Sequence, residues 1–298
     1  MADFINFCIK LQCDYKENAL LKDYTTFRVG GPCNVMVFPD TETKIAELLK
    51  YINDYNLKFY IIGKGSNLLF NDDGFDGVII NTAKFDHIEI DNNIISCSSG
   101  TSLAKLCKLA LENSLAGLEF AYGIPGSVGG AVYMNAGAYG GEIKDVISEC
   151  RFIDKNGIIR QYSKDDLNLS YRHSVFSNND DLFILSASFK LSAGTKSDIQ
   201  DKMNELIGKR KDKQPLEYPS AGSTFKRPEG HFAGALIEES GLKGYCIGGA
   251  MVSEKHAGFI INKDGASSAD ILNLIHYCQE KVYSAKGVKL EAEVKIID

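Results

Sequence analysis

The sequence predicts an α+β fold of about two domains, and three observations support this expectation. The chain has 298 residues, and a domain typically spans about 150. Apolar residues make up 44% and charged residues 24%, as in ordinary globular proteins, which excludes a disordered chain, a coiled coil or a collagen-like repeat. Helix and strand patterns alternate along the chain, with a shift in composition at SAGTKS, residues 192–197.

Helices are expected where apolar residues recur at helical spacing. The clearest pattern is in 41–56, where Ile45, Leu48, Leu49 and Ile52 share one stripe and Thr41 or Thr43 is available as the N-terminal cap. The same reasoning predicts helices at 101–113, 197–210 and 268–284.

Short apolar runs predict the strands. They lie at 59–63, 77–80, 87–90, 94–98, 146–154, 158–162 and 182–191. The end of the chain alternates regularly, which predicts one last strand with Val288, Leu290, Ala292, Val294 and Ile296 on one face, and Glu291, Glu293 and Lys295 on the other.

Charge and cysteine usage restrict the possible partners. The net charge is −6 with no basic block, which argues against nucleic-acid or membrane binding. No apolar run approaches the roughly 18 residues of a membrane span, and the first residues lack the pattern of a signal peptide. The eight cysteines show no CxxC spacing, so we expect no metal site and a cytoplasmic chain with free, mostly buried thiols.

Glycines gather in two loops, GKGSNLL at 63–69 and a stretch at 123–141. Neither contains GxGxxG or GxxxxGK[ST], so a doubly wound dinucleotide fold and a P-loop are disfavoured. Glycine lets backbone N–H groups approach a ligand closely, and Ser127 is placed to start a short helix whose N-terminus favours an anion. A tightly packed loop without ligand is the alternative for one loop; two loops together favour a cofactor that contains a pyrophosphate.

Six segments resemble the UDP-N-acetylenolpyruvoylglucosamine reductase family. They span 25 to 297 in the family's order, and so cover nearly the whole chain. They are TTFRVGG (25–31), GKGSNLL (63–69), GIPGSVGGAVYMNAGAYGGE (123–142), SYRHS (170–174), PSAGSTFKRP (219–228) and LEAEVKII (290–297).

The resemblance implies an FAD-binding fold of the PCMH or vanillyl-alcohol-oxidase type in two subdomains, followed by a C-terminal substrate-binding α+β domain. The implied division is 1–76 with the last strand 287–298, then 77–194, then 195–286, with the whole FAD domain at about 25–191. The compact run 214–222 is similar to the shorter, type II branch. Cys33 and Lys295 stand where the family often has alanine and arginine; Lys295 leaves one anion contact open.

The implied reaction is the reduction of an enolpyruvyl ether of UDP-N-acetylglucosamine to UDP-N-acetylmuramate in peptidoglycan biosynthesis. FAD, reduced by NADPH, supplies the hydride, which fits a sequence without a hydride donor of its own. The implied partners are the UDP-sugar and NADPH, with no nucleic acid, membrane or metal, and a monomer is favoured.

Three residues match the family's catalytic positions. Arg172 is the candidate cation for the carboxylate on which negative charge develops. Glu293, if burial keeps it protonated, donates a hydrogen bond to the same group. Ser223 is the proton donor, assisted by Lys226 or Arg227. Without the family match, Glu293 reads as a solvated strand residue and Ser223 as a turn serine.

The binding residues follow from the same segments. The expected FAD-binding residues are Arg28, which is equally suited to a structural ion pair, and Gly63, Lys64, Gly65, Ser66, Asn67, Gly123, Ile124, Pro125, Gly126, Ser127, Gly129, Gly130, Asn135, Ala136 and Gly137. The expected substrate-binding residues are Tyr139, Tyr171, Lys226, Arg227 and His256, for which a purely structural histidine is the alternative.

Two other functions fit parts of the pattern. One is an oxidase or dehydrogenase related to vanillyl-alcohol oxidase, which often tethers flavin through histidine or cysteine; the matched FAD loops contain neither. The other is a flavin-binding module without turnover, against which Arg172, Ser223 and Glu293 argue. Bleaching of the yellow protein by NADPH, and recovery of colour only with the enolpyruvyl sugar nucleotide, separates the three.

Overall fold

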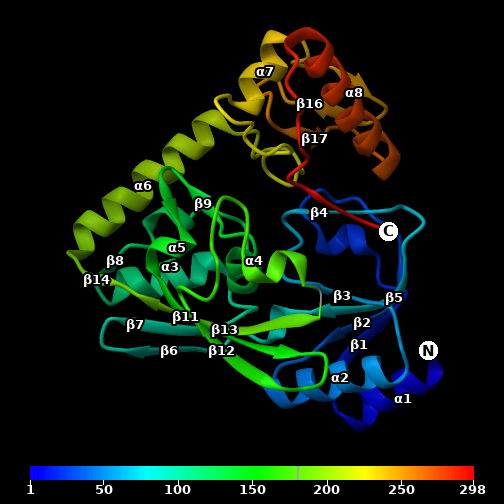
Figure 1. The fold of residues 1–298 in the computed structure, drawn as a ribbon, viewed down its shortest axis with the longest axis vertical. Helices are drawn as coiled ribbons and strands as arrows, with labels where there is room; N and C mark the ends of the chain where they lie inside the picture. Colours follow the sequence, from blue (N-terminus) through cyan, green and yellow to red (C-terminus); the bar gives the residue numbers. More distant parts are fainter. Residues whose placement is uncertain (180) are drawn as a thin grey trace. The chain divides into compact units, whose positions relative to one another are not determined.

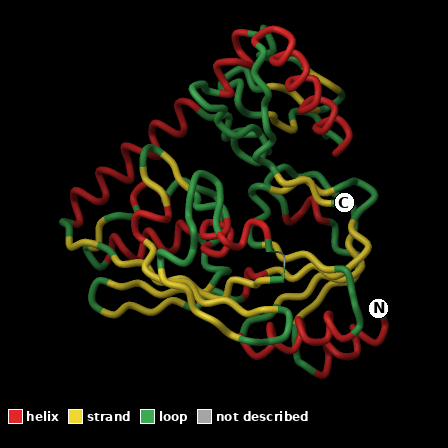
Figure 2. Tube along the Cα trace, in the orientation of Figure 1, coloured by secondary structure: helices red, strands yellow, loops and turns green. Residues whose placement is uncertain are grey.

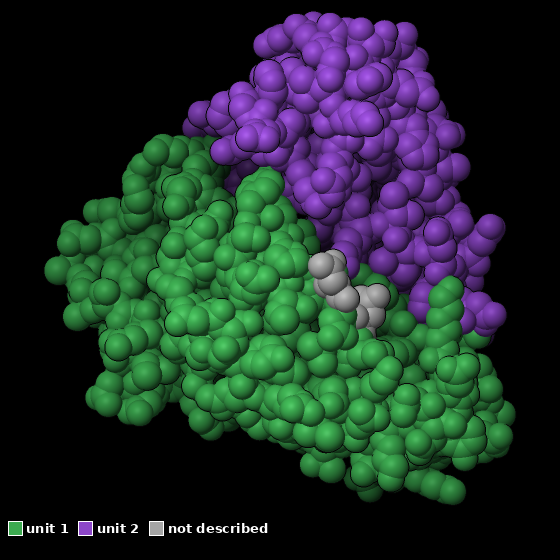
Figure 3. Space-filling view, in the orientation of Figure 1, with its two compact units in different colours: residues 1–17, 34–64, 77–209 green, residues 18–33, 65–76, 210–298 purple. Residues whose placement is uncertain are grey.

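The computed structural model describes residues 1–179 and 181–298, which form two compact units (Figure 3). Unit 1 contains 1–17, 34–64 and 77–209; unit 2 contains 18–33, 65–76 and 210–298. The chain therefore passes from unit 1 to unit 2 three times: between Glu17 and Asn18, between Lys64 and Gly65 within the GKGSN loop (63–67), and between Lys209 and Arg210. The last of these points lies beyond the composition shift at 192–197.

The first sheet of unit 1 is covered by two helices (Figure 1). Its strands lie in the order β1 (Asp14–Glu17), β2 (Cys33–Phe38), β5 (Phe75–Asn81) and β3 (Phe59–Ile62). The pairing is antiparallel between β1 and β2 and parallel between β3 and β5. Helices α1 (Ala2–Lys10) and α2 (Glu42–Asp54) bury apolar stripes that join this core, and Thr41 accepts the Lys44 N–H as the cap of α2.

The second sheet of unit 1, whose strands are yellow in Figure 2, is antiparallel. Its strands lie in the order β12 (Ile159–Ser163), β11 (Ile147–Asp154), β13 (Leu182–Lys190), β7 (Ile94–Ser98) and β6 (Ile88–Asp91). Its core includes residues of α3 (Leu103–Glu112), α4 (Val128–Tyr133), α5 (Ile143–Val146) and α6 (Lys196–Lys213).

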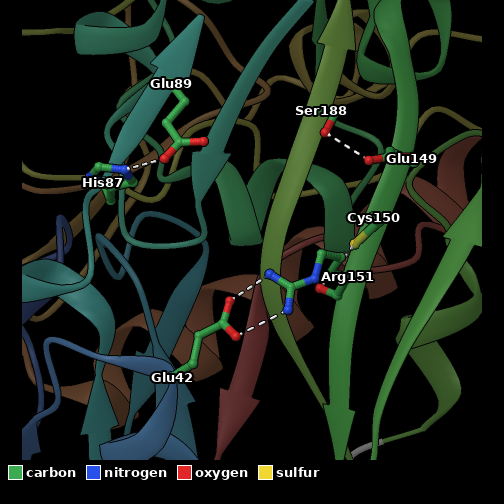
Figure 4. Close-up of polar contacts among 7 residues, drawn as sticks. All are labelled: Glu42, His87, Glu89, Glu149, Cys150, Arg151 and Ser188. Atoms are coloured by element: carbon green, nitrogen blue, oxygen red, sulfur yellow. Dashed lines mark hydrogen bonds and ion pairs between the residues drawn. The ribbon is translucent and has the colours of Figure 1, made fainter.

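A bidentate ion pair joins strand β11 of the second sheet to helix α2, which covers the first sheet (Figure 4). Arg151 on β11 donates to both carboxylate oxygens of Glu42, the first residue of α2, at 2.6 and 3.0 Å. On the same strand, β11, Glu149 accepts a hydrogen bond at 3.1 Å from Ser188, the residue that it faces on β13.

Short elements complete unit 1. The hairpin β9 (Gly137–Ala138) and β10 (Gly141–Glu142) leads into α5, and β8 (Leu115–Ala116) pairs with β14 (Ser192–Ala193). Short 3-10 helices are η1 (Leu21–Tyr24) in unit 2 and η2 (Thr82–Lys84), η3 (Glu119–Ala121) and η4 (Val175–Asn178) in unit 1.

Unit 2 has its own core. A sheet β15 (Cys246–Ile247), β16 (Ala250–Val252) and β17 (Ile260–Asn262) packs with α7 (Ala233–Glu239) and α8 (Ser268–Lys286). The capping box of Ser267 and Asp270 begins α8, and Gly287 in the left-handed conformation ends it. Strand β18 (Lys295–Ile297) runs parallel to β4 (Leu68–Phe70).

The structure confirms the helices that periodicity predicts, which are α2, α3, α6 and α8, and corrects the last strand. Regular pairing covers only Lys295–Ile297, with a single antiparallel bridge between Ala292 and Phe225 before it. Leu290 and Val294 are buried as expected, but Ile296 is 40% exposed. Alternation predicts which way side chains face, but it does not supply a neighbouring strand. Seven of the eight cysteines are buried, and Cys246 is exposed.

Candidate functional site

The two glycine loops meet inside unit 1. A Cβ on Gly63, directly after β3, would overlap the hydroxyl oxygen of Ser127 and lie 3.0 Å from its Cβ. Ser127 is the predicted start of α4, and its Oγ accepts the Gly130 N–H at 3.4 Å. A side chain at position 63 fits only if the Ser127 hydroxyl rotates away and the two loops shift by a few tenths of an ångström.

Buried hydroxyl groups lie beside the start of α4. The carbonyls of Ser99 and Thr101 accept the N–H groups of Gly129 and Val128, each at 2.8 Å. The Oγ of Ser99 and the Oγ1 of Thr101 are buried and have no hydrogen-bond partner among the described residues. Buried polar atoms are usually paired, so these hydroxyls fit a polar ligand.

The rest of the GKGSN loop is held in unit 2. Gly65 has φ +59°, and a Cβ there would overlap the carbonyl oxygen of Tyr24. Its own carbonyl accepts the Thr26 N–H at 3.1 Å. Arg28 closes this turn with φ +55°, donating its N–H to Thr25, and its side chain is exposed. Glycine approach, turn N–H groups and a nearby cation suit a phosphate-bearing cofactor.

The remaining predicted cofactor residues of the second loop lie in unit 1 and differ in the space around them. A Cβ on Gly126 would make only ordinary contact, 3.4 Å from Leu103 Cδ1, whereas one on Gly129 would lie 2.8 Å from Ser99 Cβ. The side chain of Asn135 donates both of its hydrogens within the protein. Gly123, Ile124, Ala136 and Gly137 are half-buried, and Pro125 and Gly130 are exposed.

Arg172 stands in a tight two-residue turn of unit 1. Ser170 and His173 exchange both backbone hydrogen bonds at 3.1 Å, so Tyr171 and Arg172 form the turn. Arg172 has φ +55°, the left-handed conformation that the third residue of a type II turn requires. The backbone therefore displays the half-buried arginine, and its guanidinium lies 5.1 Å from the Tyr171 ring centre.

Glu142 brings a negative charge to the same region. Its Oε2 accepts from Asn135 Nδ2 at 3.0 Å and pairs with Lys144 Nζ at 2.7 Å. The hydrogen bond from Lys144 lowers the pKa of Glu142 most, burial opposes it, and the hydrogen bond from Asn135 and the charges of Lys144 and Arg172 lower the pKa further. The pKa of this carboxyl is therefore below its ordinary value, which favours the ionised form.

Tyr139 lies at the tip of the β9–β10 hairpin. Tyr139 and Gly140 both have positive φ, +54° and +91°, as the two central residues of a type I′ turn require. The ring of Tyr139 is exposed, as is that of Tyr171. Both of these tyrosines, which are predicted to bind substrate, therefore present their side chains from the tips of turns.

Ser223 and Glu293 are brought together in unit 2. The Glu293 N–H donates to the Thr224 carbonyl at 2.8 Å, and Phe225 bridges Ala292. Thr224 is buried and fixed by its N–H to Gly258 and by the Ile260 N–H to its Oγ1. The segment carrying Ser223 thus runs beside the one carrying Glu293, and both side chains are half-buried.

Other side chains hold this part of unit 2. Asn67 Nδ2 donates to the Glu293 carbonyl at 3.0 Å, which ties the end of the GKGSN loop to the candidate acid. Lys226 pairs with Glu291. The guanidinium of Arg227 lies 4.7 Å from the ring centre of Phe232, which is 64% exposed.

His256 has a fixed tautomer when neutral. Its Nδ1 accepts the Gly258 N–H at 3.1 Å, so the proton sits on Nε2. Burial lowers the pKa of His256 below its ordinary value. The ring meets Phe259 edge-on, with the centres 5.0 Å apart. The neutral ring has one N–H to offer a ligand.

Ser99, Thr101, Glu142, Thr224 and Phe232 are the site residues that the sequence analysis did not identify. Glu142 ends the quoted glycine segment, and Thr224 lies inside the segment that carries Ser223. Their positions in matched segments were available as a signal. Their partners were not, because the contacts join segments far apart in sequence.

Two features are absent from the residues that the structure describes: a metal-ligand cluster and a membrane-spanning helix. No cluster of three or more histidine, cysteine, aspartate or glutamate side chains there is arranged to hold a metal ion. No helix within 1–179 or 181–298 combines the length and apolar character needed to cross a membrane.

Known proteins are similar to this chain along almost its whole length. Residues 33–163 match the family described as "FAD binding domain", and residues 214–297 match "UDP-N-acetylenolpyruvoylglucosamine reductase, C-terminal domain". The curated UDP-N-acetylenolpyruvoylglucosamine reductase of Clostridium tetani is 50% identical over 282 residues, 95% of this chain and 92% of the relative. That of Clostridium perfringens is 47% identical over 284 residues, covering 95% and 93%.

A solved structure is similar over the same length. The crystal structure of UDP-N-acetylenolpyruvylglucosamine reductase (MurB) from Thermus caldophilus has a TM-score of 0.81 and 33% sequence identity to this chain. The match covers 96% of this chain and 99% of that one.

Proposed function

The chain belongs to the UDP-N-acetylenolpyruvoylglucosamine reductase family, and from this premise we propose which of its residues carry out the reaction. The comparisons confirm the predicted FAD-binding PCMH-type fold with a C-terminal domain. The protein is an oxidoreductase that uses FAD and NADPH to reduce the enolpyruvyl ether of UDP-N-acetylglucosamine to UDP-N-acetylmuramate in peptidoglycan biosynthesis.

The residues of both loops fit FAD, and in this proposal they hold it, except for the Asn135 side chain, whose hydrogens are both used within the protein. When bound there, reduced FAD would supply the hydride that the reduction requires. The close approach of Gly63 to Ser127, and the unpaired hydroxyls of Ser99 and Thr101, support binding in unit 1. The proposal also assigns Gly65, Ser66, Asn67 and Arg28, which belong to unit 2, to FAD binding.

Arg172 and Glu293 stabilise the negative charge that develops on the substrate carboxylate. A guanidinium presents two parallel N–H groups to a carboxylate. A protonated Glu293 donates a further hydrogen bond to it. Preorganised donors of this kind lower the barrier by about 3 kcal/mol each in well-studied enzymes.

Ser223 delivers the proton to the carbon that bears the carboxylate. The observation that carries this assignment is the pairing of Thr224 with Glu293, which fixes the backbone next to Ser223 beside the candidate acid. A carbanion-like carbon is basic enough to take a proton from a well-placed hydroxyl, because geometry ranks before pKa in choosing a proton donor.

The test divides the reaction into two half-reactions, followed by stopped-flow flavin absorbance. Ser223→Ala is expected to leave flavin reduction by NADPH intact. Reoxidation by the enolpyruvyl substrate should slow by about 10²–10⁴-fold, as for a lost general acid. Ser223→Cys keeps a donor and should recover part of the rate. Equal slowing of both half-reactions would show that Ser223 organises the pocket instead.

The finer assignments have support of different kinds. Lys226, Arg227, Tyr139, Tyr171 and His256 are proposed to contact the sugar nucleotide, and the fixed Nε2–H of His256 supports its inclusion. We also propose that 195–286 forms the substrate-binding domain and that the enzyme works in the cytoplasm as a monomer. Sedimentation of the purified enzyme tests the last point, with a dimer as the contrary result.

A further inference from the structure

Asn135 is a fully buried residue whose side chain is committed to the protein. It has φ +41° and 0% exposure. Its Nδ2 donates to the Ser170 carbonyl at 2.9 Å and to Glu142 Oε2 at 3.0 Å, and its Oδ1 accepts the Lys144 N–H at 2.9 Å. An amide offers two hydrogens, and both are used here. The side chain therefore ties three segments of unit 1 together.

One of these segments is the turn that displays Arg172. Ser170 forms the base of that turn, paired with His173. A left-handed backbone at a residue with a side chain costs about 1 kcal/mol or more and persists only where its surroundings hold it. The bond from Asn135 to the Ser170 carbonyl supplies such a hold at the base of the turn, so the Arg172 backbone is fixed through Ser170 rather than by its own preference.

The second segment carries the counter-charge. Glu142 shares one carboxylate oxygen between Asn135 and Lys144, and the electrostatic influence of Arg172 reaches the same carboxylate. Asn135 therefore holds both the base of the turn that bears the cation and the Glu142 carboxylate. A cation on a fixed backbone is restrained before substrate arrives.

We propose that Asn135 is a positioning residue for Arg172, because its side chain fixes the turn that carries the arginine. The proposal rests on the proposed role of Arg172 toward the substrate carboxylate. It assigns the Asn135 side chain to the catalytic cation rather than to the flavin.

The principal test is Asn135→Asp in the flavin-loaded enzyme. Aspartate keeps the shape and can still accept the Lys144 N–H. It has at most one hydrogen to donate, and the neighbouring Glu142 carboxylate takes it, so the bond to the Ser170 carbonyl is lost. We expect reoxidation by the enolpyruvyl substrate to slow by about 10- to 100-fold, since small displacements of a catalytic group cost this much. Flavin content and flavin reduction by NADPH should be unchanged, with the loss in kcat rather than in KM.

A matched control makes the same chemical change elsewhere in unit 1. Asn93 Nδ2 donates to the Leu191 carbonyl at 2.9 Å, and Asn93→Asp removes that bond without touching the Arg172 turn. It should leave both half-reactions at the wild-type rates. A rate loss in this control equal to that in Asn135→Asp would overturn the proposal, because any buried amide bond would then have the same effect.

Coupling to Arg172 separates positioning from general stability. In an Arg172→Ala background, Asn135→Asp should change the substrate half-reaction by less than about threefold, because independent sites add and coupled sites do not. Asn135→Ala, which removes the same hydrogen bonds without adding a charge, should show the same coupling, and it carries the test if Asn135→Asp does not fold. Additive effects overturn the inference while the role of Arg172 stands. A normal substrate half-reaction in Arg172→Ala overturns both.

Discussion

Gly63→Ala tests whether the two glycine loops form the cofactor cradle. An added Cβ would overlap the Ser127 hydroxyl and lie 3.0 Å from Ser127 Cβ. Gly63 does not have positive φ, so alanine brings no backbone strain, and the conflict is only between the loops. The variant can relieve it by letting the loops part, which a cofactor bound by both would resist.

The size of the effect follows from these contacts. Rotating the Ser127 hydroxyl away gives up the N-cap bond to Gly130, typically about 1 kcal/mol. Separating the two Cβ atoms by a few tenths of an ångström adds about 1 kcal/mol, the low end of overpacking costs. Together they make about 2 kcal/mol, or roughly 30-fold weaker FAD binding.

The assay is titration of the apoprotein with FAD, followed by the quenching of flavin fluorescence. Gly208→Ala is the matched control, because a Cβ on this glycine of α6 meets nothing within 4 Å. It should bind FAD normally and gain about 0.5–1 kcal/mol of stability. Ser127→Gly removes the clashing group and should restore part of the affinity when combined with Gly63→Ala.

Normal FAD affinity in Gly63→Ala would refute the cradle, provided that the apoprotein unfolds at the wild-type temperature. Gly126→Ala gives an independent reading. Its Cβ makes only ordinary contact with Leu103, so weaker FAD binding there reports the approach of the cofactor itself.

Two further predictions concern stability. In a double-mutant cycle with Glu42→Gln and Arg151→Gln, denaturant unfolding should give a coupling energy of about 0.5–1 kcal/mol, because the pair is bidentate but about one-third exposed. A coupling energy of zero would show that the ion pair does not stabilise the fold. Burial lowers the pKa of His256, so folding favours the neutral ring. The stability that depends on the neutral ring is complete above about pH 6.5 and is lost as the pH falls from there toward the folded pKa. The Tm of the wild type should therefore fall more steeply between pH 7 and 5 than the Tm of His256→Gln, and parallel curves would contradict this.

The helices that the sequence predicted are those with a long repeating pattern. Helix α2 follows the stripe of Ile45, Leu48 and Ile52, and its cap at Thr41 has the expected bond. Helix α7 was missed because seven residues give fewer than two full turns of pattern, and its AGAL start includes a glycine. Local periodicity needs length before it can be distinguished from chance.

The geometry of the site depends on contacts that no local pattern encodes. The left-handed turn at Arg172 involves an arginine, which rarely adopts this conformation and gives no signal in the sequence. The bond from Asn135 to Ser170 spans 35 residues, and that from Asn67 to Glu293 spans 226. The family resemblance supplied the residues, whereas their restraints required the folded chain.

The GKGSN loop (63–67) contributes several of the proposed contacts although it is only five residues long. Its first residue, Gly63, leaves room for the cap of α4 in unit 1, and its last, Asn67, holds the carbonyl of Glu293 in unit 2. Between them, Gly65 adopts a positive φ against the Tyr24 carbonyl. The two glycines are required by close backbone approach and the asparagine by a hydrogen bond. Five residues therefore connect the proposed flavin cradle to the proposed acid through the covalent chain itself.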